Sequence, residues 1–183
     1  MRKITVMTVI LSILVCFQGC GRNMEEGEKK QIDGRHWDID SVKANKIMME
    51  LWDAIEKGDT ESVEAMLSQK AKEEIENYED RILEFLDAFG SGIVAVRPHG
   101  YTGSFKSREY GETTCYKIYA DYWVETEKGI FRLNFDCVIK NEAAPEEVGI
   151  YRIFLAPKED DESGKYSGAG GSEFYICVFP FED

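Results

Sequence analysis

Histidine and the common catalytic motifs are scarce or missing in this chain of 183 residues. There are two histidines, His36 and His99, and no serine-hydrolase GxSxG, Walker, zinc-protease HExxH or dinucleotide-binding fingerprint. The chain also lacks a CxxC pair and any cysteine close to a histidine, which argues against a zinc site. The residue pattern therefore assigns no catalytic residue, no metal ligand and no cofactor.

No apolar run is long enough for a typical membrane-spanning helix. The longest, ITVMTVILSILV at residues 4–15, falls short of the about 20 apolar residues that a spanning helix needs. It follows Arg2 and Lys3, and it ends before Gly19, Cys20 and an abruptly polar stretch. This order is typical of a secretory signal peptide, so we expect residues 1–19 to be removed. An uncut anchor, or an ordinary secretory signal with an incidental cysteine, is the alternative.

The end of this leader resembles the lipobox of bacterial lipoproteins, in which a cysteine after a small residue is acylated and becomes the new N-terminus. Cys20 after Gly19 occupies that position, although Phe17 and Gln18 replace the usual leucine and small residue. The resemblance implies a cell-membrane protein held on the extracytoplasmic face by acyl chains, palmitate among them, on Cys20. Two or more chains anchor stably where a single chain does not.

Acidic residues outnumber basic ones, and the formal net charge is −13. Removal of the leader takes two positive charges away and leaves −15. Such a charge repels nucleic acid and anionic head groups, so we expect no nucleic-acid partner and anchoring by acyl chains alone. Residues 20–40 are polar and read as a flexible tether, and residues 41–183 are long enough for a single domain.

Three of the five cysteines fall in strand-like runs of this domain: Cys115, Cys137 and Cys177. An odd number outside the cytoplasm leaves at least one thiol unpaired. We expect buried thiols that pack as small hydrophobic side chains, and one disulfide among the three is the alternative.

The spacing of apolar residues changes from a helical to a strand period near residue 90. It predicts three helices, at residues 41–57, 60–67 and 69–89, with Ser41 able to cap the first. Two-residue alternation then predicts an antiparallel sheet, with a loop and a short edge strand at 98–112. The strands are expected at residues 93–96, 113–126, 130–140, 148–156 and 174–181. Helices followed by strands indicate an α+β fold, with the helices packed on one face of the sheet.

Several segments resemble known proteins. The stretch ELWDAIEKGDTESVEAMLSQKA resembles the helical opening of the nuclear-transport-factor-two-like (cystatin-like) superfamily. SREYGE, EKGIFRLNF and PEEVGIYRI resemble an uncharacterised bacterial lipoprotein family of that superfamily. The likeness covers residues 40–157 and implies three helices packed into a strongly curved, cone-shaped antiparallel sheet.

The resemblance also implies a cavity between the helices and the sheet, which relatives use as an enzyme site, use as a ligand cradle, or fill with side chains. The aromatic residues expected to line it are Trp52, Tyr116, Tyr122, Phe135 and Tyr151. Their tyrosine hydroxyls would serve a small apolar ligand, or the tyrosines would be ordinary core residues.

Catalysis would need an acid or a base inside that cavity. The alternation places Asp121 and Asp136 on the opposite face of the sheet, unless a β-bulge shifts the register. His99 lies in the loop and remains a weak candidate. A small isomerase, dehydratase or hydrolase that uses one of these groups is therefore an alternative function.

The outward face of the predicted hairpin is rather apolar. Tyr119, Trp123, Ile130 and Val138 alternate outward, and exposed patches of this kind often mark an interface. Since relatives commonly pair through this face, a homodimer or a protein partner is expected there, unless other segments cover it. The sequence thus predicts a non-catalytic, lipid-anchored module that binds a small apolar ligand or a protein, with an envelope scaffold as the alternative.

Overall fold

The structure is a computed structural model that describes residue 32 and residues 38–90, 92–100, 102–159 and 175–178. The chain divides into two compact units, Met1–Lys30 and Gln31–Asp183, and every described residue belongs to the second. The predicted signal peptide and Cys20 therefore lie outside the described residues. None of the described helices is both long and apolar enough to cross a membrane.

Two helices begin the described domain much as the periodicity predicts. Helix α1 spans Ile39–Lys57 and ends at Gly58, whose left-handed backbone (φ 59°) suits a residue without a side chain. Its N-cap is Asp38 rather than the predicted Ser41, and the Asp38 carboxylate accepts a hydrogen bond from the Ser41 backbone N–H at 2.6 Å. Helix α2 spans Thr60–Met66 and is capped by Asp59.

The prediction of one helix at residues 69–89 is wrong, because this segment forms two helices. Helix α3 spans Gln69–Glu74, and α4 spans Tyr78–Ala88. Between them Asn77 adopts a left-handed conformation with φ of 53°, which asparagine tolerates better than most residues but which no α-helix continues through. The described chain therefore has four α-helices instead of three, and a short 3-10 helix, η1, at Pro145–Glu147.

One six-stranded sheet follows, with the order β1-β3-β4-β5-β6 and with β2 also paired to β3. Its strands are β1 Ile93–Pro98, β2 Gly103–Glu109, β3 Glu112–Thr126, β4 Gly129–Asn141, β5 Gly149–Pro157 and β6 Tyr175–Val178. Four of the five strand pairs are antiparallel, as predicted. The pair β5–β6 is parallel, so the expectation of a wholly antiparallel sheet is wrong for the last strand.

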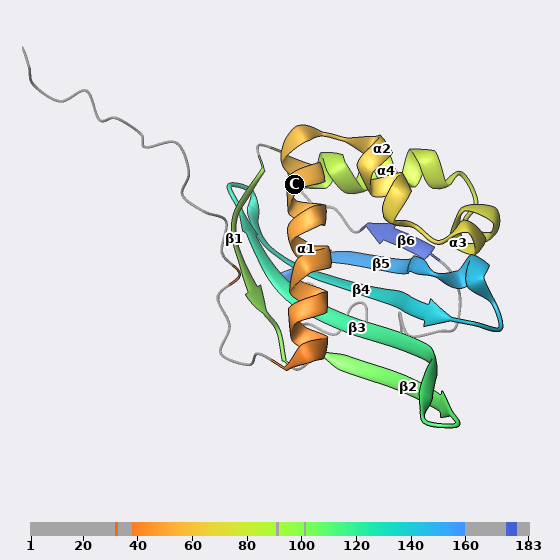
Figure 1. The fold of residues 1–183 in the computed structure, drawn as a ribbon. Helices are drawn as coiled ribbons and strands as arrows, with labels where there is room; N and C mark the ends of the chain where they lie inside the picture. The colour runs from red at the N-terminus through yellow and green to blue at the C-terminus, as the bar shows by residue number, and fades with distance from the viewer. Residues whose placement is uncertain (1–31, 33–37, 91, 101, 160–174, 179–183) are drawn as a thin grey trace, which may run out of the picture. The chain divides into compact units, whose positions relative to one another are not determined.

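The helices pack against one face of this sheet, which we call the inner face (Figure 1). Alternate residues of β3 and β4 point inward and are buried with the apolar side chains of the helices: Tyr116, Ile118, Ala120, Tyr122, Val124, Phe131, Leu133 and Phe135. The structure thus belongs to the α+β class, with helices on one face of an open, mainly antiparallel sheet.

Two backbone contacts join other segments to the sheet, one at β5 and one at β1. The Ser68 backbone N–H donates to the Ile150 carbonyl at 2.8 Å, and a β-carbon on Gly149 would lie only 2.7 Å from the Ser68 nitrogen. Ile32, inside the predicted tether, is 5% exposed and forms a parallel bridge with Val96 of β1. The core therefore includes a residue from the segment that precedes the helices.

Candidate binding surface on the outer face of the sheet

Four of the five predicted pocket residues lie on the helix-covered side of the domain. Trp52, Tyr116, Tyr122 and Phe135 are each 6% exposed or less, and all four belong to the main core cluster. The rings of Tyr122 and Phe135 stack with centroids 6.0 Å apart. These side chains therefore pack against their neighbours in the protein interior.

The polar groups of these aromatic residues have partners within the domain. The Trp52 indole Nε1–H donates to Glu56 Oε1 at 2.6 Å, and the Tyr122 hydroxyl donates to Asn45 Oδ1 at 2.9 Å. Burial raises the pKa of Tyr122 above its ordinary value, which further favours the neutral hydroxyl that donates this hydrogen bond. Internal hydrogen bonds thus account for polar groups that were expected to meet a ligand.

The Tyr116 hydroxyl donates to Asp40 at the start of α1. Asp40 also accepts hydrogen bonds from the Ser104 hydroxyl at 2.5 Å and from Lys106 Nζ at 2.7 Å. Burial opposes ionisation of Asp40, but these three donors together lower its pKa to about 2. The ammonium groups of Lys43 and Lys106 each lie 4.5 Å from the Tyr116 ring centroid. The cluster fastens β2 and β3 to α1.

Tyr151, the fifth predicted pocket residue, packs against the core cluster without being fully buried in it. It is half-buried, its hydroxyl is in hydrogen-bonding contact with Tyr119, and Lys117 Nζ lies 5.6 Å from its ring centroid. Lys117 and Tyr119 alternate with the inward residues of β3, so they mark the opposite, outer face of the sheet. A register shift in the β4–β5 pairing between Asp136 and Cys137 accounts for the placement of Tyr151 with this group.

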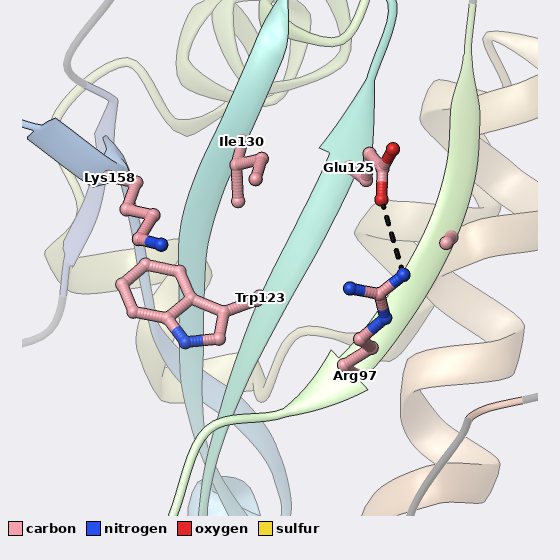
Figure 2. A pocket seen from close by; sticks show the side chains of 6 residues that line it. Arg97, Trp123, Glu125, Ile130 and Lys158 are labelled. Carbon is pink, nitrogen blue, oxygen red and sulfur yellow. Dashed lines mark ion pairs between the residues drawn. The ribbon is translucent and has the colours of Figure 1, made fainter.

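A hollow of about 80 Å³ lies on the outer face, around Trp123. We call its lining the Trp123 surface: Ala95, Arg97, Trp123, Glu125, Ile130 and Lys158. Figure 2 shows the Trp123 ring beside Lys158, with Arg97 reaching toward Glu125 from the neighbouring strand. The pairing register explains this arrangement, because Arg97 faces Trp123 and Ala95 faces Glu125 across β1 and β3.

Charged and aromatic groups surround the Trp123 ring. The His99 ring centroid lies 4.3 Å from that of Trp123, and Lys158 Nζ lies 5.4 Å from the Trp123 ring centroid. Arg97 pairs with Glu125 at 3.6 Å, and both side chains are largely exposed. An aromatic floor with basic groups at its rim is the composition of many protein interfaces.

Residues 50–158 match the family described as a domain of unknown function, DUF5104. The chain belongs to the DUF5104 family. The matched stretch contains every residue that lines the Trp123 surface, together with the last eight residues of α1 and all the described helices and strands from α2 to β5. No curated protein matches the chain.

The structure pairs two of the three acid–base candidates, Asp121 and Asp136, with arginines, and it places the third, His99, beside Trp123. Asp121 forms a bidentate ion pair with Arg132, which donates from Nε to Oδ1 at 3.1 Å and from Nη2 to Oδ2 at 2.7 Å. The Asp121 backbone carbonyl accepts a hydrogen bond from the His99 backbone N–H. Asp136 is 3% exposed and is ion-paired with Arg152. Burial raises the pKa of Asp136, and the positive charge of Arg152 opposes that rise. Both carboxylates are held by arginines and lie on the outer face.

The interface candidates Tyr119 and Trp123 both lie on this outer face, and Tyr119 is 38% exposed. Among the residues that the structure describes, no cluster of three or more His, Cys, Asp or Glu side chains could hold a metal ion. Cys115 and Cys137 are free thiols, and burial raises the pKa of Cys137 to about 12. The Cys177 side chain lies outside the described residues.

Sequence reasoning found Trp123 and Ile130 but missed Ala95, Arg97 and Lys158. The apolar outward positions of the hairpin indicated the first two. The others come from β1 and from the residue after β5, and only the strand order brings them to the same hollow. The alternation in β1 carried a partial signal, since Ala95 and Arg97 flank the buried Val96.

Proposed function

We propose that this DUF5104 protein is a lipid-anchored, extracytoplasmic, non-catalytic module that binds a protein through the Trp123 surface. The observation that carries the proposal is the hollow itself. Its floor contains Trp123 and Ile130, its rim contains Arg97 and Lys158, and it lies on the face opposite the helices. Tryptophan and arginine are enriched among residues that dominate protein binding energies.

The size of the hollow supports a protein rather than an enclosed small ligand. Ligand clefts in proteins usually have volumes of about 300–1,000 Å³. A volume of about 80 Å³ suits a single inserted side chain instead. Trp52, Tyr116, Tyr122 and Phe135, which were expected to hold an apolar ligand, pack in the core, and their packing is further support for a protein partner.

The lipid anchor rests on the leader and on Cys20, and mass spectrometry tests it directly. We expect the mature chain to begin at Cys20 and to carry a mass increment of at least two acyl chains. Cys20→Ala should abolish that increment and leave the protein extractable without detergent. A mature chain that keeps residues 1–19, or an unmodified Cys20, would remove the anchor from the proposal.

Photo-crosslinking in living cells tests the surface. Benzoylphenylalanine replaces Ile130, which is 36% exposed beside Trp123, in the full chain. The matched control replaces Leu83 of α4, which is 49% exposed. We expect an adduct with one defined protein from position 130 and none from position 83. Adducts of equal yield from both positions would contradict a specific surface.

An adduct of twice the chain mass would instead support the alternative, an envelope scaffold that pairs with a second copy of itself. Arg97 and Arg132 are already paired with Glu125 and Asp121, so the charges of this surface do not decide between a second copy and a different protein. The mass of the adduct distinguishes the two partners.

A further inference from the structure

Charge is unevenly divided between the helices and the sheet. Residues 39–90, which contain all four α-helices, hold 14 acidic and six basic residues, a net charge of −8. The central segments of β1, β3, β4 and β5, residues 95–97, 117–125, 130–138 and 152–157, hold four basic and three acidic residues. The basic ones are Arg97, Lys117, Arg132 and Arg152, and Lys158 and Glu159 follow β5 directly. The outer face therefore carries a local positive excess in a strongly acidic protein.

The strand register places these charges on one face. Lys117, Asp121 and Glu125 alternate with the buried residues of β3, and Arg132 does so in β4. Asp136 occupies a further outward position of β4 and is buried against Arg152. Arg97 pairs with Trp123 across the strands, and Arg152 pairs with Asp136. The inward positions of the same segments carry no charged residue, so the positive excess belongs to the outer face alone.

At the Trp123 surface, basic side chains lie beside apolar ones. The Trp123 ring and Ile130 line the hollow, and the basic groups of Arg97 and Lys158 lie at its edge. Arg132 is on the strand next to Trp123 and faces it directly across the β3–β4 pairing. Glu125 lines the same hollow and pairs with Arg97, so the lining holds two basic groups and one acidic group. A partner with one apolar side chain flanked by negative charge complements this lining.

We propose that the Trp123 surface binds an acidic segment of a partner protein, with an aromatic or aliphatic side chain in the hollow and flanking carboxylates near Arg97 and Lys158. This inference rests on the proposed protein-binding function and names the chemistry of its partner. The acidic helices repel such a segment, so it is directed to the outer face. A basic segment would prefer the helices instead.

Synthetic peptides test this chemistry without knowledge of the natural partner. The probe is a fluorescein-labelled DEFED peptide, titrated with the full chain in nonionic detergent and followed by fluorescence anisotropy. Two control peptides, DESED and KKFKK, remove the apolar anchor and reverse the charge. We expect DEFED to bind, both controls to bind at least about tenfold more weakly, and binding to weaken as salt rises.

Two charge reversals serve as matched variants. Arg97→Glu alters the rim of the hollow, and Lys46→Glu alters an exposed α1 cation that pairs with Glu50 at 3.8 Å, much as Arg97 pairs with Glu125 at 3.6 Å. We expect Arg97→Glu to weaken DEFED binding by about tenfold and Lys46→Glu to leave it unchanged.

Absence of DEFED binding, equal binding of KKFKK, or equal losses in the two variants would overturn the inference. The crosslinking experiment tests whether the surface binds a protein, and the peptide experiment tests whether that partner is acidic. If position 130 crosslinks to a defined protein and DEFED does not bind, the binding module stands and its acidic partner does not. If neither experiment succeeds, the Trp123 surface is not a protein-binding site.

Discussion

The two faces of one sheet differ sharply in this domain. On the inner face, the inward residues from Tyr116 to Val124 of β3 and from Phe131 to Phe135 of β4 are apolar or aromatic and are 6% exposed or less. On the outer face the alternating positions carry Lys117, Asp121, Trp123, Glu125 and Arg132. The same strands therefore supply a packed interior to the helices and, around Trp123, a charged and aromatic surface, whereas Asp136 farther along the outer face is buried against Arg152. The difference suggests that stability resides in one face and recognition in the other.

Truncation of one large side chain on each face tests this division with the largest expected effect. Phe135 is fully buried, so Phe135→Ala should lower the free energy of unfolding by about 3–5 kcal/mol. Trp123→Ala on the outer face should lower it by about 1 kcal/mol. Urea denaturation followed by circular dichroism measures both. Equal losses would show that the outer face is also part of the folding core.

A glycine pair sharpens the comparison at the contact between helices and sheet. A β-carbon on Gly149 would meet the backbone of Leu67 and Ser68 at 2.7–2.9 Å, whereas at Gly111 it would meet nothing within 4 Å. Both glycines have positive φ, so backbone strain is common to the two changes. Gly149→Ala should therefore destabilise the protein by about 1–3 kcal/mol more than Gly111→Ala. Similar unfolding midpoints would contradict the close approach of α2–α3 to β5.

The Asp40 cluster predicts a pH dependence of stability. Its folded pKa of about 2 lies below the ordinary value, so the folded state holds fewer protons than the unfolded state in acid. The stabilisation is complete well above the ordinary pKa and is lost as the pH falls toward 2. Asp40→Asn should lower stability by about 1–2 kcal/mol at neutral pH.

The same variant should flatten the acid limb of the pH profile, because the titrating carboxylate is gone. Urea midpoints measured from about pH 6 to about pH 2.5 test this. Glu50→Gln, on the exposed side of α1, is the control and should keep the acid limb. An unchanged limb in Asp40→Asn would mean that the cluster contributes little.

The smallest effect is expected at the rim of the Trp123 surface. The Arg97–Glu125 ion pair is solvent-exposed, so Arg97→Gln should change the free energy of unfolding by about 0.5 kcal/mol or less. Thermal denaturation monitored by circular dichroism would detect a larger change. A large loss would make Arg97 a structural residue and weaken the comparison of the two faces.

Local periodicity predicted the elements in which the spacing of apolar residues is regular. The hairpin of β3 and β4 alternates regularly, so its inward and outward residues could be read in advance. The break at Asn77 could not, because Ile75, Tyr78 and Ile82 keep a helical spacing through a residue that leaves the helix. Long-range pairing was also hidden, and so the parallel β5–β6 pair and the burial of Ile32 against β1 were missed.

The candidate site was predictable only in part for the same reason. Trp123 stood out as a large aromatic residue at an outward position, but Arg97 and Lys158 join it through strand order. The regular alternation of β5 predicts Tyr151 on the inner face, but a register shift in the β4–β5 pairing interrupts that alternation. One such irregularity moves a side chain across the sheet, and the composition of the strand does not reveal it.

The yield of the photo-crosslinked adduct from position 130, measured in two variants, tests the division of the faces most directly. Trp123→Glu alters the outer face, and Phe135→Leu loosens the core at a cost of about 1 kcal/mol. With both proteins folded at the assay temperature, we predict that Trp123→Glu abolishes the adduct and Phe135→Leu retains it. An adduct that survives Trp123→Glu but disappears in Phe135→Leu would contradict the account.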